Sequence, residues 1–319
     1  MEKTKSEEIE KKVISTGIIL ILALLGIFLK GYHLYLLNEI LIMAIFSYGF
    51  SLLFSHSGYL SFGQAAFYSA GGYTVALMYR HVGDSTWIAF LAAIFVTFVI
   101  SSIIGFLSVR LGRIYFALLT LGFAQMIFAV VFRSRFTGGD DGIPGIRPGP
   151  LDFGLFEISL TSPTNYYYFT LVLFLISVFI IHRIIHSPFG YTIRSMRDNP
   201  ERATFIGINV LSHARIVFVI SAIFAGLAGA LYVPLAKYAS PALAHFETSG
   251  DPVMACLIGG LYTFSGPFVG SIVYTVLKSY LMTTVGNYPL VMGPILLFLV
   301  LFFRNGIMGF IAEKIGKNL

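Results

Sequence analysis

The chain has 319 residues, of which 57% are apolar and only 11% are charged, and its net charge at pH 7 is +6. Soluble domains carry about a quarter of charged residues, so this composition excludes an ordinary soluble protein. Apolar runs of roughly 20 residues recur without strict alternation, which is typical of membrane-spanning helices and argues against a β-barrel. We therefore expect an all-α, polytopic transmembrane helical bundle. The basic excess predicts membrane topology, not nucleic-acid binding.

The chain divides into a mixed-charge head at residues 1–12, a transmembrane domain at residues 13–303 and a tail at residues 304–319. The candidate spans cover residues 13–29, 34–54, 60–79, 86–108, 114–132, 166–185, 214–236, 252–265, 267–285 and 289–303. The pair 252–265 and 267–285 is separated only by Gly266-Pro267. It forms either a hairpin or a re-entrant segment, which is tolerated where protein covers it. Ten spans are preferred and eight are the alternative.

The placement of Lys and Arg favours an even number of spans with both termini in the cytoplasm. With the head inside, fourteen basic residues fall on the inner side and six on the outer side, which agrees with the positive-inside rule. This topology leaves residues 133–165 as one long outer loop, rich in glycine and proline and without a core of its own. Asp140 and Asp141 in this loop lack the spacing of calcium ligands, so no metal site is predicted.

The connector at residues 187–213 contains the longest charged segment between two apolar runs, GYTIRSMRDNPERATFIG at 190–207. Asn199 (or Asp198) can cap a helix, Pro200 suits the first helical position, and Gly207 suits the residue beyond the end. These signals predict a short cytoplasmic helix of about two turns. The alternative is an ordinary connector whose arginines only follow the positive-inside rule.

Two predicted spans carry small residues at every fourth position, which lets helix backbones approach closely. These residues are Ser57, Ser61, Ala65 and Ser69 in one span and Ser221, Ala225 and Gly229 in the other. They indicate either a pathway-lining helix or static packing. Residues 259–270, GGLYTFSGPFVG, contain too many helix breakers for a continuous span. They form either a broken helix that exposes backbone groups to a substrate or a hairpin turn.

Glu39 and Lys278 are the most costly side chains inside the predicted spans. One hypothesis pairs them within the bundle; the alternative is that Lys278 extends its ammonium to the interface. Two catalytic patterns are missing from the sequence. It contains no G-x-x-x-x-G-K-[ST] phosphate loop and no H-E-x-x-H. Any ATP that drives the protein must therefore be bound by another chain.

Six elements, taken in order, resemble the membrane subunit of ATP-binding-cassette importers for branched-chain amino acids, in particular the LivM-type permease. They are SGYLSFGQAAFYSAGGY at 57–73, RIYFALLTLGFAQMI at 113–127, TGGDDGIPGI at 137–146, FGYTIRSMRDNPERATFIGINV at 189–210 with the span FVISAIFAGLAGALY that follows, SPALAHF at 240–246 and GGLYTFSGPFVGS at 259–271. The resemblance covers about residues 40–310. It is broken at Ser55, at Tyr262 and at Pro252 after Asp251, which leaves the substrate open.

The resemblance implies a non-catalytic permease subunit in the cell inner membrane that moves amino acids inward. Leucine, isoleucine and valine are the default substrates, and urea or short amides are the alternative within the family. The implied partners are a sister LivH-type permease, two ABC ATPase subunits that bind ATP and Mg, and an extracytoplasmic substrate-binding protein. No cofactor is expected in this chain. Composition alone also allows a stand-alone secondary transporter or channel.

The resemblance also assigns residues. Residues 194–207 are similar to the coupling loop of importers, and their arginines are expected to pair with acidic rims of an ATPase. The expected ATPase-coupling residues are Arg194, Arg197, Asp198, Asn199, Glu201, Ala203 and Gly207. The expected translocation-pathway residues are Ser57, Gly58, Ser61, Gly63, Gln64, Gly259, Gly260, Gly266 and Pro267. No catalytic or metal-ligating residue is expected.

Overall fold

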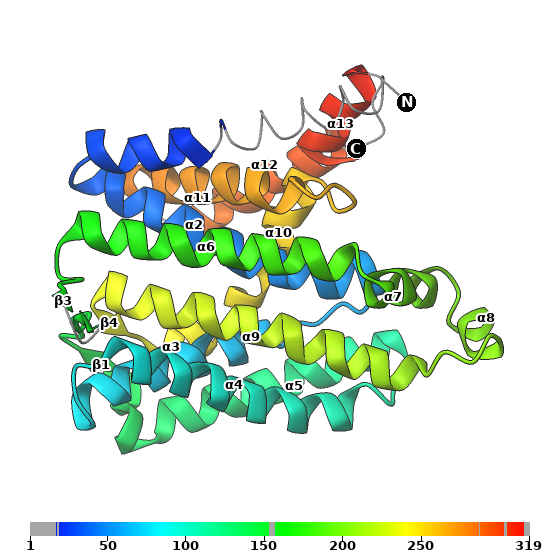
Figure 1. Ribbon diagram of the computed structural model, residues 1–319, viewed down its shortest axis with the longest axis horizontal. Coiled ribbons are helices and arrows are strands. Elements are labelled where there is room, and N and C mark those ends of the chain that lie inside the picture. The colour runs from blue at the N-terminus through cyan, green and yellow to red at the C-terminus, as the bar shows by residue number, and fades with distance from the viewer. Residues whose placement is uncertain (1–16, 18, 153–156, 287, 303–304, 316–319) are drawn as a thin grey trace.

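The computed structural model describes residues 17, 19–152, 157–286, 288–302 and 305–315. After a first helix at Ile19–Phe28, the helices are α2 Tyr32–Ser51, η1 Leu52–His56, α3 Gln64–His81, α4 Thr86–Ser108, α5 Arg113–Arg133, η2 Arg135–Thr137, η3 Gly139–Asp141, α6 Pro163–Ile185, α7 Pro188–Asp198, α8 Pro200–Phe205, α9 Val210–Ala236, η4 Pro241–Ala244, α10 Phe246–Gly259, α11 Gly266–Thr284, α12 Tyr288–Phe302 and α13 Gly306–Ile315. The long helices run side by side (Figure 1), with the α5–α6 connection at one end and α7 and α8 at the other. We call these the loop end and the α8 end.

The predicted all-α membrane bundle is confirmed, and each predicted span overlaps a helix. Among the described residues, five helices are long and apolar enough to cross a membrane: Tyr32–His56, Thr86–Ser108, Arg113–Arg133, Pro163–Ile185 and Val210–Ala236. The remaining helices are shorter or less apolar. Helix α10, with 14 residues, is the shortest of those on predicted spans 252–265 to 289–303. The count of ten spans and the cytoplasmic placement of the termini stay predictions, and the head at 1–12 lies outside the described residues.

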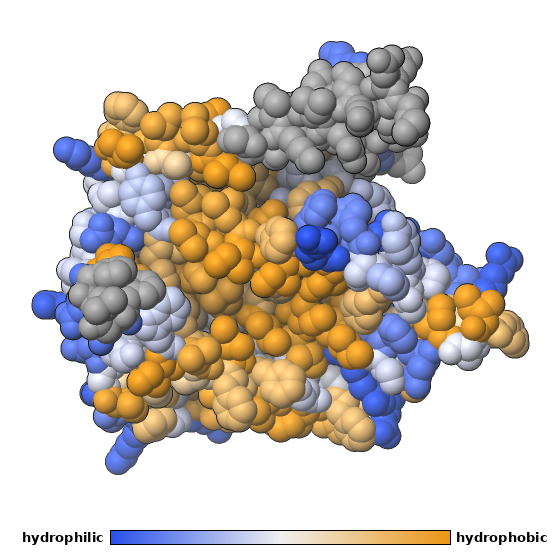
Figure 2. Space-filling model, viewed as in Figure 1, coloured by the Kyte–Doolittle hydropathy of each residue, from blue (hydrophilic) through white to orange (hydrophobic). Residues whose placement is uncertain are grey.

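Helices α2 and α9 form the centre of the bundle. More than half of each is buried, whereas about a third of α4, α5 and α6 is buried. The exposed faces of these outer helices carry large apolar side chains such as Phe95, Ile114 and Phe179. Figure 2 shows this apolar surface across the middle of the molecule, with hydrophilic residues gathered toward the two ends. Such a belt is what contact with lipid requires.

Helices α3 and α9 approach until their backbones touch. A Cβ atom added to Gly229 would lie 1.8 Å from the carbonyl oxygen of Tyr68, and one added to Gly71 would lie 2.0 Å from that of Gly226. Ala65 and Ser69 of the first predicted stripe therefore lie on the helix that packs against the second stripe, whereas Ser57 and Ser61 precede α3. Because lipid supplies no hydrophobic drive for helix association, this close contact supplies the packing that holds the centre together. The static-packing interpretation of both stripes fits this geometry.

The loop end is covered by residues 134–152 and 157–162 of the α5–α6 connection, which pack against the helices. Strand β1 (Ile143–Pro144) is antiparallel to β4 (Tyr238–Ala239), and β2 (Leu151–Asp152) is antiparallel to β3 (Glu157–Ile158). Ile143 and Ile146 are buried against Val131 and Val233 of the helices. The loop thus has turn-rich structure, as predicted, but it completes the core of the bundle. The two short sheets are the one non-helical addition to the predicted fold class within the described residues.

We predict that Gly229→Ala lowers the stability of the purified protein, because the new methyl group would collide with the Tyr68 carbonyl. Overpacking of this kind costs about 1–3 kcal/mol. The measurement is the midpoint of thermal unfolding in detergent. Gly122→Ala is the matched control, since a Cβ at Gly122 in α5 meets no atom within 4 Å. Equal midpoints for the two variants would contradict the proposed close contact.

Candidate functional site

The short helix predicted in the charged connector is α8, and its predicted capping and terminating residues are in place. The Asn199 side chain accepts a hydrogen bond of 2.9 Å from the Arg202 backbone N–H, and Pro200 is the first helical residue. Gly207 follows the helix with a φ of +89°, a conformation that favours glycine. The sequence did not reveal α7, the helix that precedes α8. It begins after Ser187, which caps it, and Pro188 occupies its first turn.

Helix α8 carries apolar side chains into solvent. Phe205, the last residue of α8, is 88% exposed, and Ile206, which follows it, is 75% exposed. Figure 2 shows an apolar patch at the far right, where Figure 1 places α8. Ala203 points the other way and is only 2% exposed, so this predicted coupling residue packs α8 onto the bundle. Glu201 lies exposed in the first turn. The apolar tip was not predicted, although two large apolar residues directly before a terminating glycine could have indicated it.

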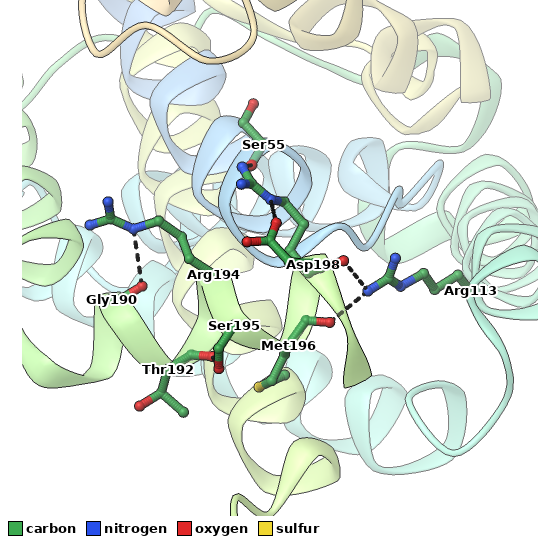
Figure 3. Close-up of polar contacts among 9 residues, drawn as sticks. Ser55, Arg113, Gly190, Thr192, Arg194, Ser195, Met196 and Asp198 are labelled. Atoms are coloured by element: carbon green, nitrogen blue, oxygen red, sulfur yellow. Dashed lines mark hydrogen bonds and ion pairs between the residues drawn. The ribbon is translucent and has the colours of Figure 1, made fainter. Parts of the chain in front are cut away.

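Arg194 binds its own chain and does not point outward to a partner. Its Nε donates to the Gly190 carbonyl at 3.3 Å, and its Nη2 donates to the Ile185 carbonyl at the end of α6. Figure 3 shows the first of these bonds. The expected pairing of Arg194 with an acidic rim of an ATPase stays a prediction. Within this chain, Arg194 fastens α7 to α6.

Arg197 joins three segments that are far apart in the sequence. Its Nη1 donates to the Ser55 carbonyl at 2.8 Å, and its Nε pairs with Asp198 at 2.9 Å. Its guanidinium also lies 5.4 Å from the ring centroid of Tyr262, within the range of a cation–π contact. The arginine thus links α7 to the end of η1 and to the turn between α10 and α11.

Arg113, the first residue of α5, holds the other side of α7. Its Nη2 donates to the carbonyls of Met196 and Arg197, at 2.8 Å and 2.9 Å, as Figure 3 shows. Gly58 lies beneath both arginines with a φ of +77°, and a Cβ there would lie 3.0 Å from the Cγ of Arg197. We call Ser55, Arg113, Arg197 and Tyr262 the junction. It connects the predicted coupling segment to both predicted pathway segments.

The first predicted pathway segment is an interruption between two helices. The predicted span 60–79 begins four residues late, at Gln64, because residues 58–63 are not helical. Before this interruption, α2 changes into the π-helix η1, and π-helical turns are frequent at functional sites.

Buried polar contacts hold the predicted pathway residues of this interruption in place. The Ser57 hydroxyl donates to the Leu53 carbonyl, Ser61 accepts from the Gly63 N–H, and Gln64 donates to Ser221. A Cβ at Gly63 would lie 2.7 Å from the Thr120 carbonyl. These residues are packed against α5 and α9, and their role in translocation stays a prediction.

The second predicted pathway segment is the turn of a helical hairpin. Helix α10 ends at Gly259, and α11 begins at Gly266, with Pro267 in its first turn. A Cβ at Gly259 would lie 1.8 Å from the Gly266 carbonyl, and Gly260 has a φ of +120°. The structure thus favours the hairpin over the broken-helix alternative. Gly306, at the start of α13, packs on the same turn.

Lys278 has a different partner from the one hypothesised. Its Nζ lies 2.8 Å from the Asp251 carboxylate, on the neighbouring helix α10. Glu39 lies on α2 and lines the same cavity as these two residues. Asp251 was not predicted as this partner, because in the sequence it stands out only as the residue before Pro252. Its position at the start of a predicted span could have marked it as a third costly charge.

A family of known proteins matches most of the chain. The family model described as the permease component of branched-chain amino acid transport systems matches residues 32–304. This chain belongs to that family. The members are transport components, and the described helices agree with a multi-pass membrane protein.

Individual relatives fit the same assignment. The chain is 27% identical over 286 residues to the high-affinity branched-chain amino acid transport system permease protein LivM of Escherichia coli, covering 83% of this chain and 67% of the relative. It is 25% identical over 193 residues to the galactose/methyl galactoside import permease protein MglC of Salmonella typhimurium, covering 57% and 54%. It is 28% identical over 162 residues to the "Probable branched-chain amino acid transport permease protein LivH" of Methanocaldococcus jannaschii, covering 47% of each. No solved structure matches the chain.

We predict that Arg197→Met loosens the junction, because the Ser55 carbonyl loses its charged donor. Hydrogen bonds to charged groups contribute about 1.5–3 kcal/mol, so local opening should become roughly tenfold or more frequent. The measurement is hydrogen exchange at the amides of Gly58 and Tyr59, which bond back to Phe54 and Leu53. Arg202→Met, at an exposed position of α8, is the control. Equal exchange rates in both variants would argue against a stabilising role of the bond from Arg197 to Ser55.

Proposed function

We propose that this chain is the membrane subunit of an ATP-driven importer in the cell inner membrane, and that it moves branched-chain amino acids into the cytoplasm. The family match and the LivM relative support the transport class. The apolar tip of α8, held by the junction, is the single observation that supports coupling to a separate ATPase. In this proposal the α8 end faces the cytoplasm, as the charge count predicts.

The comparisons support one of the proposed partners, a second permease. Similarity to relatives named LivM and LivH favours pairing with a second, related permease. Two ATPase subunits would bind ATP and Mg²⁺, and an extracytoplasmic binding protein would deliver the substrate at the loop end. Phe205 and Ile206 would enter a groove of one ATPase, because large exposed apolar side chains anchor interfaces when a partner buries them.

The junction suggests how movement of an ATPase reaches the transmembrane helices. A displacement of α8 passes to α7, which Asn199 joins to it without a flexible linker. Arg197 then carries the displacement to Ser55 at the end of α2–η1 and to Tyr262 in the α10–α11 turn. Rigid-body movement of packed helices is a common form of such switching.

We predict that Phe205→Asp combined with Ile206→Asp uncouples transport while the protein still inserts and folds, since both side chains lie outside the core. ATP-driven uptake by the assembled complex should fall about tenfold or more, as expected for an interface hot spot, and ATPase subunits should no longer copurify. The control is Val82→Asp, which places the same charge on an exposed apolar residue beyond α3 at the loop end. Full uptake in the double variant would refute the docking role.

A second prediction separates the importer from a stand-alone secondary transporter or channel. Proteoliposomes with the full complex should accumulate leucine only when ATP reaches the ATPase subunits, because the sequence contains no phosphate loop. Proteoliposomes with this chain alone should show no uptake under an ion gradient. Gradient-driven uptake by the chain alone would favour the secondary transporter. Uptake of urea or short amides in place of leucine would change the substrate and keep the class.

A further inference from the structure

Two cavities at the loop end share one wall. The larger cavity, of about 700 Å³, lies among η4, α10 and α11. The smaller, of about 170 Å³, reaches inward to α2 and α9. Asp251, Tyr274 and Lys278 line both cavities, so these three side chains lie between them. We call these three side chains the trio; Ala242 and Thr248 line both cavities as well.

Within the trio, Lys278 and Asp251 form an ion pair, and Tyr274 adds a hydrogen bond to it. Lys278 Nζ lies 2.8 Å from one oxygen of Asp251, and the Tyr274 hydroxyl donates to the other oxygen at 2.6 Å. The two charged side chains are 26% and 22% exposed. Charges inside a membrane bundle are costly unless they are paired and hydrogen-bonded. The close packing of α10 on α11 is made by glycines at other positions, so it does not depend on this ion pair.

The smaller cavity adds a second carboxyl group and an apolar wall. Glu39 projects from α2 among the lining residues, so the cavity has two carboxyl groups for one ammonium. The Lys278 ammonium, which has three N–H donors, supplies the positive charge of this cavity. On the remaining side, Ile42, Met43 and Phe46 present apolar surface. Charged groups of both signs beside an apolar wall match an amino acid with an aliphatic side chain.

We propose that the smaller cavity is a transit site for a free α-amino acid with an aliphatic side chain. Lys278 binds the α-carboxylate, and Glu39 and Asp251 bind the α-ammonium. The aliphatic side chain lies against Ile42, Met43 and Phe46. This inference rests on the proposed function, because it gives the cargo of the importer a place within this chain. An amide lacks the anion for Lys278, and a simple carboxylic acid lacks the cation for Glu39.

The test uses a cysteine reporter in the full-length chain. Thr248 lines both cavities, and Cys256, the single native cysteine, is fully buried. In Thr248→Cys we measure the rate of modification by a small methanethiosulfonate with L-leucine, L-leucinamide or 4-methylpentanoate present. Saturating leucine should slow modification about tenfold or more, because ligands in such pockets bury most of their surface. The amide and the acid should leave the rate nearly unchanged.

Variants distinguish recognition from a structural role. Glu39→Gln or Lys278→Met, in the Thr248→Cys background, should abolish protection by leucine. Glu247→Gln should keep it, since Glu247 lines only the larger cavity. The double exchange Asp251→Lys with Lys278→Asp restores an ion pair but reverses its direction, and should also abolish protection.

Three outcomes would overturn the proposal: no protection by leucine, equal protection by all three compounds, or protection that survives the double exchange. The proposed function is tested separately by ATP-driven uptake of the assembled complex. Uptake without protection in the reporter variant would reject the transit site alone. Protection without ATP-driven uptake would reject the importer and keep the site.

Discussion

Three arginines bind the carbonyls at the ends of three helical segments, and the arrangement of the α8 end depends on these bonds. Arg194 binds the end of α6, Arg197 the end of η1, and Arg113 the end of α7. The last carbonyls of a helix have no partner within it and carry a partial negative charge. A guanidinium suits this position because it is always charged and offers several donors. The same side chains that indicate topology in the sequence therefore also close the ends of the helices.

Capping residues and apolar runs in the sequence predicted the helices whose limits depend on neighbouring residues. Asn199, Pro200 and Gly207 act on their immediate neighbours, and α8 lies where they place it. The apolar runs likewise gave the positions of the long helices. In contrast, Ser187 and Pro188 also start a helix, yet α7 was missed because its polar composition was interpreted as a connector.

Contacts between distant segments could not be predicted in this way. Arg197 and Ser55 are 142 positions apart, and nothing in either segment identifies the other. Asp251 and Lys278 lie on adjacent helices, but their pairing depends on the register set by Gly259 and Gly266 in the turn. The hypothesis of a Glu39–Lys278 pair found the correct region and missed the closer carboxylate. The burial of Ala203 likewise could not be predicted from the sequence, since alanine is as common on a docking face as in a core.

The α10–α11 hairpin reaches from one end of the molecule toward the other. Its turn contains Tyr262, which contacts Arg197. Its two helices contain Asp251 in α10 and Lys278 in α11. Glycine contacts between the two helices leave little room for them to slide. If the hairpin moves as one body, the two ends share one equilibrium. Thermodynamic linkage then requires reciprocity: whatever factor ATPase docking applies to the affinity for an amino acid, the bound amino acid must apply to the affinity for the ATPase.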